Sequence, residues 1–390
     1  MNSKKSIYLD YAATTPVDPR VIKAMLPYFN KKFANAATIY KLGLEAKKAV
    51  EDSRRLMAEA LGAVNKEVFF TSSATESNNT VLKGIAFANK DKGNHIIISE
   101  IEHDCILNSA KWLKKQGFKI TRLKVDDRYG RIHPKSVAKA ITDETILVSI
   151  LHANNEIGTI QDIAKIGQIC RQKGVYFHTD AAQSFAKIPI NIKEMNIDLL
   201  TASAHKIYGP KGVALLYIKQ GVAIEPLLHG GGQESNMRSS TSNTAAIVGF
   251  AKATELCLAE MEKESKRLTK LRDKVIKTVL SKIPETSLNG HPTERLANNI
   301  NLSFSFVEGE SIILLLDAAG ISASTGSACS SKNLEPSHVL KSCGIKAEKI
   351  HGSLRLSLGR WTNEKDIDYL LKTLPAIIKK LRKVSPFRKK

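Results

Sequence analysis

The chain is poor in cysteine and in aromatic residues, and it contains no long apolar run. Its 390 residues include 5 cysteines and 6% aromatic residues, and no two cysteines form a Cys-x-x-Cys pair. A scattered, odd set of cysteines argues against a disulfide framework and against a structural zinc site. No apolar stretch is long enough to span a bilayer, and the first residues carry no apolar signal-peptide region. We therefore expect a cytoplasmic protein in a reducing compartment, without membrane association.

Acidic residues are also scarce. The 59 Lys and Arg residues outnumber the 38 Asp and Glu residues and give a formal net charge of +21. A basic chain suits nucleic acid, an acidic partner or an anionic substrate. The lysines, however, are spread along the whole chain, and the one local concentration, residues 379–390, has no interleaved aromatic residues for base stacking. We predict a solvated lysine-rich surface and do not expect nucleic-acid binding.

Residues 65–220 alternate short β-rich runs with helical patterns at 75–90, 104–117 and 162–173. Strands that are apolar on both faces and alternate with helices predict an α/β fold with a mostly parallel sheet covered on both sides. In such sheets ligands bind beyond the carboxyl ends of the strands. The expected strands are Val68–Thr71, His95–Ser99, Ile120–Lys124, Ile146–Leu151, Val175–Thr179, Asp198–Thr201 and Val213–Ile218.

A long helical pattern, residues 245–282, follows Gly230-Gly231-Gly232 and is a plausible connector to a second domain. The remainder reads as a small α+β domain, with strands near 298–304 and 354–357 and helices near 308–319 and 363–382. We predict a large domain over 15–260. The small domain would comprise 1–14 and 261–390 and carry a cysteine-bearing loop at about 322–335.

Lys206 lies in Ser203-Ala-His-Lys206, directly after an apolar run, and a Gly-Pro turn follows it. A lysine at the mouth of a buried strand suits Schiff-base chemistry, because burial lowers the pKa of an ammonium and so supplies more of the nucleophilic amine. The alternative is a strand-end lysine that simply reaches solvent. The neighbouring strand ends decide between the two.

A phosphate site is suggested by Ser72-Ser73-Ala-Thr75-Glu76, which follows the first strand and opens a helix. Ser73-x-x-Glu76 matches a capping box, and that cap alone would explain the pattern. A helix N-terminus at a strand end also presents free N–H groups and a positive dipole to an anion, and Thr75 would add a hydroxyl.

Three further strand ends carry polar residues. Asp180 is consistent with a helix N-cap or with the charge partner of a pyridinium ring, with Gln183 beside it. Asn155 is explained by turn chemistry or by a side-chain amide for a substrate carboxylate. His103 would stack on a ring and move protons. These residues are weak evidence one by one, but with Lys206 they fall at the strand ends of one sheet.

Cys329 stands among small residues in Ser324-Thr-Gly-Ser-Ala-Cys-Ser-Ser331, which predicts an exposed, flexible loop and a reactive thiol. Cys170 and Cys257 lie in helical patterns and are expected to be buried, and Cys343 is expected to be structural. Cys105 opens a helix after His103 and is the second choice for a reactive thiol.

With these motifs the chain resembles the pyridoxal-phosphate-dependent cysteine desulfurases, of the iron–sulfur-assembly branch of the class V aminotransferase family. The resemblance runs from Tyr8 to Arg360. It is carried by Ala-Thr-Glu-Ser-Asn at 74–78, Ala-Asn-Asn-Glu-Ile-Gly-Thr at 153–159, Asp-Ala-Ala-Gln at 180–183, the Ser-Ala-His-Lys block, Gly-Gly-Gly-Gln-Glu at 230–234 and Gly-Ser-Ala-Cys-Ser-Ser at 326–331. It implies a fold-type I pyridoxal-phosphate transferase and a homodimer.

The resemblance also implies roles for single residues. Lys206 would hold the cofactor as a Schiff base and move the Cα proton, Asp180 and Gln183 would hold the ring, and His103 would stack over it. Arg355 and Asn155 would clamp the substrate carboxylate, and Cys329 would take the sulfur of L-cysteine as a persulfide, release alanine and pass the sulfur to an acceptor or iron–sulfur scaffold protein. The phosphate would be bound by Thr75, Ser203 and His205, together with Thr241 from the other subunit.

The chain departs from the family pattern at several glycines. Ala34 and the residues to Tyr40 replace the usual Phe-Gly-Asn-Pro-Ser-Ser-x-His context, and serines stand at 73 and 240 where glycine is usual. Ser235-Asn236 replaces Arg-Gly. We expect the left-handed backbone conformations that such glycines serve to be lost. The alternative functions are a selenocysteine lyase, another class V aminotransferase, or a weakened paralogue that acts as an interaction partner.

Overall fold

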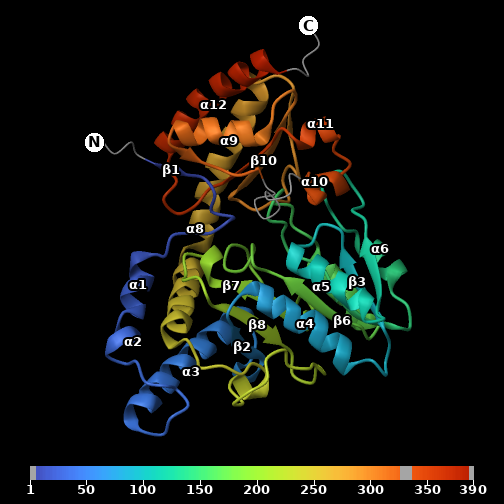
Figure 1. The fold of residues 1–390 in the computed structure, drawn as a ribbon, viewed down its shortest axis with the longest axis vertical. Helices are drawn as coiled ribbons and strands as arrows, with labels where there is room; N and C mark the ends of the chain where they lie inside the picture. The colour runs from blue at the N-terminus through green and yellow to red at the C-terminus, as the bar shows by residue number, and fades with distance from the viewer. Residues whose placement is uncertain (1–5, 326–335, 386–390) are drawn as a thin grey trace.

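The computed structural model, which describes residues 6–325 and 336–385, builds its lower part on a seven-stranded sheet (Figure 1). The strand order is β2-β8-β7-β6-β5-β3-β4, with β8 antiparallel to both neighbours and the consecutive strands from β7 to β4 parallel. Each predicted strand is present within two residues of its expected range, and the mostly parallel α/β sheet is confirmed. The strands are β2 (Val68–Thr71), β3 (His95–Ser99), β4 (Lys119–Leu123), β5 (Thr145–Ser149), β6 (Tyr176–Asp180), β7 (Leu199–Ser203) and β8 (Ala214–Ile218).

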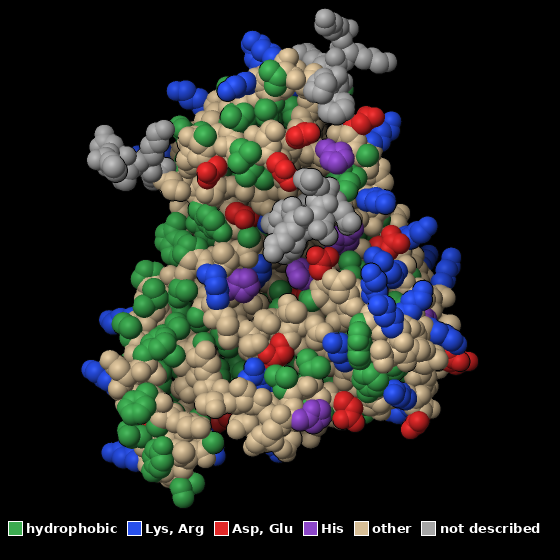
Figure 2. Space-filling view, in the orientation of Figure 1, with side chains coloured by type: hydrophobic (Ala, Val, Ile, Leu, Met, Phe, Trp, Pro, Cys, Tyr) green, Lys and Arg blue, Asp and Glu red, His purple; other side chains and the backbone are tan. Residues whose placement is uncertain are grey.

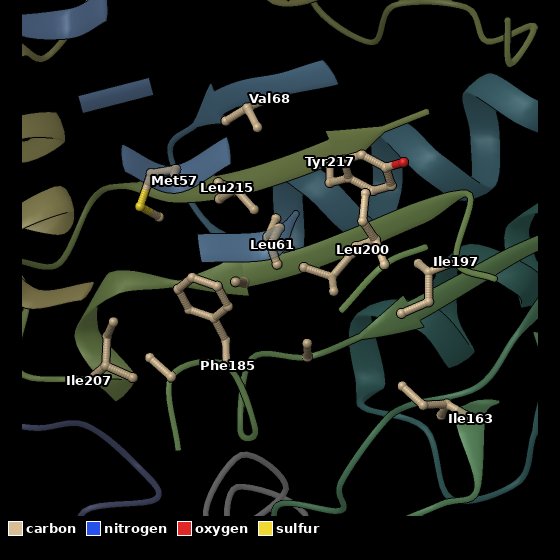
Figure 3. Packing of buried hydrophobic residues seen from close by; sticks show 14 of the residues in the cluster. Met57, Leu61, Val68, Ile163, Phe185, Ile197, Leu200, Ile207, Leu215 and Tyr217 are labelled. Atoms are coloured by element: carbon tan, nitrogen blue, oxygen red, sulfur yellow. The ribbon is translucent and has the colours of Figure 1, made fainter. Parts of the chain in front are cut away.

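Helices cover both faces of this sheet because its strands are apolar on both sides. On β8, Leu215 and Tyr217 point to one face, whereas Leu216 and Ile218 point to the other. The first core lies on the face of α3, α7 and α8, and Figure 3 shows part of its packing. The second core lies on the face of α4 and α5. These helices are α3 (Lys41–Leu61), α4 (Ala74–Ala88), α5 (Asp104–Lys115), α7 (Ile163–Gln172) and α8 (Thr244–Lys282).

A third core forms in the upper part of the molecule, around a three-stranded antiparallel sheet of order β12-β10-β9 (Figure 1). Helix α8 belongs to two cores, because Cys257 packs in the first and Leu268 in the third. The predicted domain boundary near residue 260 falls between them and stays a prediction. The elements of this part are α9 (Gly309–Ala318), α12 (Glu364–Val384), β9 (Thr286–Leu288), β10 (Asn299–Phe304) and β12 (Ser353–Ser357), with β1 (Ile7–Tyr8) paired to β11 (Ile321–Ser322).

The remaining helices are short. Among the described residues, no helix combines the length and the apolar character that a membrane crossing needs. The short helices are α1 (Pro19–Met25), α2 (Pro27–Asn30), α6 (Pro134–Ala140), α10 (His338–Ser342) and α11 (Ala347–Ile350), with 3₁₀ turns η1 (Asn65–Glu67), η2 (Ala204–Lys206) and η3 (Glu234–Asn236).

The expected loss of left-handed backbone is wrong at η3. Glu234, Ser235 and Asn236 all have positive φ, of 48°, 54° and 67°. Asparagine tolerates this region better than most residues, and the Glu234 side chain is tightly bound. Its two carboxylate oxygens accept from the Arg54 guanidinium at 2.7 and 2.9 Å, and one also accepts from the Phe70 backbone N–H at 2.9 Å. The buried ion pair therefore holds the turn in a strained conformation against β2.

We predict that Glu234→Ala lowers the free energy of unfolding by roughly 3–5 kcal/mol, because it leaves the Arg54 cation buried without its main partner. Glu51→Ala is a matched control, since Glu51 is the half-exposed second partner of Arg54, and its loss should cost less than about 1 kcal/mol. Urea unfolding followed by circular dichroism measures both changes. An equal decrease in the free energy of unfolding for the two variants would contradict the role of Glu234 as the main partner of Arg54.

Candidate active site

Nine of the eleven predicted site residues line one cavity of about 340 Å³. The cavity lies beyond the carboxyl ends of the large sheet, where the parallel strands meet at one edge. Segments from both ends of the chain complete its wall, through Ala12, Ala13, His338 and Arg355. The nine residues are Thr75, His103, Asn155, Asp180, Gln183, Ser203, His205, Lys206 and Arg355.

Two predicted residues are elsewhere. Thr241 is exposed and is not part of the cavity wall. Its expected binding of the phosphate in a second subunit stays a prediction. Cys329 lies outside the described residues. The predicted chemical roles of all eleven residues therefore remain predictions, whereas the grouping of nine of them in space is an observation.

Lys206 ends the 3₁₀ turn η2, directly after β7. Its Nζ donates to the backbone carbonyls of Ala12 and Ala13, both at 2.7 Å. The Gln183 amide donates to the same Ala12 carbonyl at 3.0 Å. The lysine therefore does not extend into solvent from its strand end, since the N-terminal segment of the chain lies across it.

The N-terminus of α4 faces the cavity with Ser73, Ala74 and Thr75. Ser73 caps the helix, since its Oγ accepts from the Glu76 backbone N–H at 3.1 Å. The predicted capping box is half wrong, because the Glu76 carboxylate bonds to Ser72 and pairs with Arg238 at 2.8 Å instead of returning to Ser73. A guanidinium is a stronger partner than a backbone amide.

The His205 side chain lines this end of the cavity and is held in place. His205 Nδ1 lies 3.1 Å from Thr14 Oγ1. Burial, helped by the nearby Lys206 charge, lowers the pKa of His205 to about 4, so its imidazole is neutral at pH 7. Free helix N–H groups, a hydroxyl from Thr75, a hydroxyl from Ser203 and a neutral imidazole form a donor set that suits a phosphate.

Asp180 ends β6 and does not cap a helix. Its Oδ1 accepts from the Ala182 backbone N–H at 2.9 Å, and its Oδ2 accepts from Asn78 Nδ2 at 2.7 Å. Two donors fix the orientation of the carboxylate, and the side chain lines the cavity. A fixed carboxylate on the cavity floor fits a cationic ring nitrogen.

Arg355 lies in β12 and contributes to the cavity wall. Its Nη1 donates to the Asn155 backbone carbonyl at 3.1 Å, and its Nη2 pairs with Asp10 at 2.9 Å. Asn155 therefore contacts Arg355 through its main-chain carbonyl. The binding of a substrate carboxylate by its side-chain amide stays a prediction. An almost fully buried guanidinium in a cavity wall is suited to a carboxylate ligand.

His103 caps α5, because its Nδ1 accepts from the Cys105 backbone N–H at 3.2 Å. Cys105 also lines the cavity, and its Sγ lies 3.1 Å from the same nitrogen. The other described cysteines are unpaired, and Cys170, Cys257 and Cys343 are buried as predicted. Burial raises the pKa of the Cys257 thiol to about 11 and of Cys170 and Cys343 to about 12, so these three are poor nucleophiles.

Sequence reasoning assigned no role to Asp10 or Asn78. Asn78 ends the Ala-Thr-Glu-Ser-Asn motif at 74–78, and Asp10 lies two residues after Tyr8, where the family resemblance begins. The signal was therefore visible, but their partners, Asp180 and Arg355, are 102 and 345 residues away. Contacts at that separation follow from the topology and not from local pattern.

Known proteins resemble this chain over nearly its whole length. The aminotransferase class-V model matches residues 7–370. A protein from Methanosarcina thermophila named cysteine desulfurase IscS is 54% identical and covers 99% of this chain and 95% of its own. Another protein of that name, from Dictyoglomus turgidum, is 51% identical, with 99% and 98% covered.

Solved structures agree in fold. A NifS-like protein superposes with a TM-score of 0.91 at 36% identity, covering 96% of this chain and 99% of its own. A structure of SspA in complex with cysteine superposes with a TM-score of 0.82, also at 36% identity, covering 90% and 99%. The likeness therefore extends over nearly all of the chain.

The buried histidines beneath the cavity predict a pH dependence of stability. Burial lowers the pKa of His178 to about 3 and that of His152 to about 4. Between these values and the ordinary value near 6.5 the unfolded chain binds the proton and the folded chain does not, so each histidine makes stability fall as pH falls.

We predict that His178→Asn reduces the slope of unfolding free energy against pH by about 1.4 kcal/mol per pH unit between pH 6 and pH 4.5. Urea titrations at several pH values measure the slope. His133→Asn, a change at an exposed histidine, is the control. An unchanged slope in His178→Asn would show that this imidazole is charged in the folded protein.

Proposed function

The chain belongs to the class-V aminotransferase family, and we propose that it is a cysteine desulfurase that converts L-cysteine to L-alanine and keeps the sulfur as an enzyme persulfide. The observation that carries the proposal is the single cavity that unites Lys206, Asp180 and Arg355. Relatives named cysteine desulfurase support the proposal, because they are 54% and 51% identical to this chain over nearly its whole length.

The residues present fit pyridoxal 5′-phosphate, the cofactor of this family. One cavity is lined by all the groups that the cofactor needs: the phosphate donors at α4 and His205, the carboxylate of Asp180 and the amine of Lys206. When bound, the cofactor supplies an electron sink that stabilises negative charge at the substrate Cα. Lys206 Nζ would hold the cofactor and then move the Cα proton, and His103 would stack over the ring.

Arg355 and Asn155 would orient the substrate through its carboxylate. A guanidinium can bind both carboxylate oxygens at once, which fixes the direction of the Cα substituents as well as the position of the substrate. The buried setting of Arg355 excludes water from this contact. Binding at this residue would therefore determine which substrate bond faces Lys206.

Cys329 would be the sulfur acceptor. Its thiolate would attack the sulfur of L-cysteine, and an S–S bond would form as the Cβ–S bond breaks. The electron pair of the broken bond would stay on the carbon side, where Cβ takes up a proton and becomes the methyl group of L-alanine. The persulfide would then pass to an acceptor protein for iron–sulfur assembly or thiolation, in the cytoplasm. The unpaired state of the described cysteines supports a reducing compartment.

We further propose that the active form is a homodimer. Large apolar side chains are exposed on α1, α2 and the segment up to the first turn of α3, on the left of the molecule (Figure 2). A contiguous exposed apolar patch of this kind is typical of a protein interface. The exposed Thr241 would then reach the phosphate end of the partner's cavity. The patch comprises Ile22, Leu26, Phe29, Phe33, Ile39, Tyr40, Leu42 and Leu44.

We predict that Cys329→Ala lowers alanine release from L-cysteine at least 100-fold, because the sulfur acceptor is removed while the cofactor site is intact. The assay is alanine release by the purified pyridoxal-phosphate-loaded protein, with mass spectrometry of the persulfide. Cys105→Ala is the control for a second cavity thiol and should keep most activity. Full activity in Cys329→Ala would disprove the proposed role, and turnover of an amino acceptor that Cys329→Ala leaves unchanged would favour an aminotransferase.

For the dimer, we predict that Phe29→Glu combined with Phe33→Glu yields monomers in sedimentation velocity, because two charges would have to be buried at the interface. Leu314→Glu, at an equally exposed leucine of α9, should leave the dimer intact. A wild-type protein that sediments as a monomer would contradict the proposal.

A further inference from the structure

A carboxylate of the protein already occupies one edge of the Arg355 guanidinium. Asp10 Oδ1 lies 2.9 Å from Nη2, and the two side chains are only 17% and 3% exposed. The Asn155 carbonyl accepts from Nη1 at 3.1 Å. Because this ion pair is largely shielded from water, salt screens it weakly. The cation that a substrate carboxylate needs is therefore partly neutralised before any ligand arrives.

The fold fixes Asp10 in this place. Its main chain forms a parallel bridge with Ser357, on the same strand as Arg355. The Tyr8 hydroxyl donates to the Asp10 carbonyl at 3.0 Å, and the Ala12 backbone N–H donates to Ser357 Oγ at 2.8 Å. The Asp10 backbone is therefore fixed beside Arg355, in the same segment that contacts Lys206.

We propose that Asp10 is a positioning residue that weakens the binding of carboxylates at Arg355. The inference rests on the proposed function of Arg355 as the carboxylate clamp. Removal of the Asp10 charge has two opposite effects: the guanidinium loses one orienting hydrogen bond, and a bound carboxylate loses a like charge on the same guanidinium. Between two anions that share one buried cation, the repulsion exceeds the net contribution of one hydrogen bond, so removal of the charge tightens binding.

Weak carboxylate binding has a use in the proposed reaction. L-Cysteine and L-alanine carry the same α-carboxylate. The binding free energy that Arg355 contributes to the substrate is therefore also contributed to the product. Binding that is equal in substrate and product does not speed the chemical step, and it slows product release. Asp10 would keep that shared contact weak enough for alanine to leave.

The test compares ligand binding by the wild-type protein and by Asp10→Asn, which keeps the size and an acceptor oxygen but removes the charge. The probe is 3-mercaptopropionate, which carries the carboxylate and thiol of cysteine and, having no amino group, is not turned over. Calorimetric titration of the pyridoxal-phosphate-loaded protein should give a Kd at least about tenfold lower for Asp10→Asn. KM for cysteine should fall in parallel, while kcat stays equal or falls.

Two further variants make the result specific. Asp10→Ala should also tighten binding, because the same charge is gone, and it keeps the proposal testable if Asp10→Asn does not fold. Asp368→Asn, which removes an aspartate from an exposed pair with Lys274, controls for the change in net charge and should leave Kd unchanged. The visible absorbance of the bound cofactor and the melting temperature report whether each variant is intact.

An unchanged or weaker Kd in Asp10→Asn would overturn the inference and leave Asp10 with a purely orienting role. General structural damage does not tighten binding, so a lower Kd separates the proposed effect from it. A wild-type protein that releases no alanine from cysteine would refute the proposed function instead, and the comparison with 3-mercaptopropionate would still decide the effect of Asp10 on carboxylates.

Discussion

The N-terminal segment, which lies across the carboxyl edge of the large sheet, is the constraint on which the site depends. Without the cofactor, its Ala12 and Ala13 carbonyls accept from Lys206 Nζ. The same segment reaches Arg355 through Asp10 and Gln183 through Ala12. One short stretch of backbone thus contacts both the residues that would bind the cofactor and the residue that would bind the substrate. The geometry of this stretch sets the distance between the two groups.

A second set of contacts joins the phosphate end of the cavity to the proposed subunit interface. Arg238 pairs with Glu76 in the first turn of α4, while Glu234, four residues earlier, is buried against Arg54. The stretch that leads to Thr241 is therefore anchored at two points on its own subunit. A loop held in this way presents Thr241 at a fixed place on the surface, as a residue shared between subunits requires.

Much of the fold and of the site was predictable from sequence, because the signals were local. Apolar strands alternating with helices indicated the parallel sheet, and polar residues at strand ends indicated where the cavity lies. The features that the sequence did not predict are contacts between distant residues and one backbone conformation. The Asp10–Arg355 pair joins the two ends of the chain, the Glu76 carboxylate turned to a distant arginine, and η3 kept positive φ without glycine because a buried ion pair compensates the strain.

The third core has a consequence for how the protein is made. It buries Ile7 and Leu9 against residues from 268 to 378, so this segment is synthesised long before the residues that bury it. Such sequence separation slows folding. Because the cavity wall takes Ala12 and Arg355 from these same two ends, a chain still under synthesis has no complete pocket. A chain that ends before Arg355 would therefore lack the proposed carboxylate clamp, and the proposed persulfide chemistry would begin only once β12 is in place.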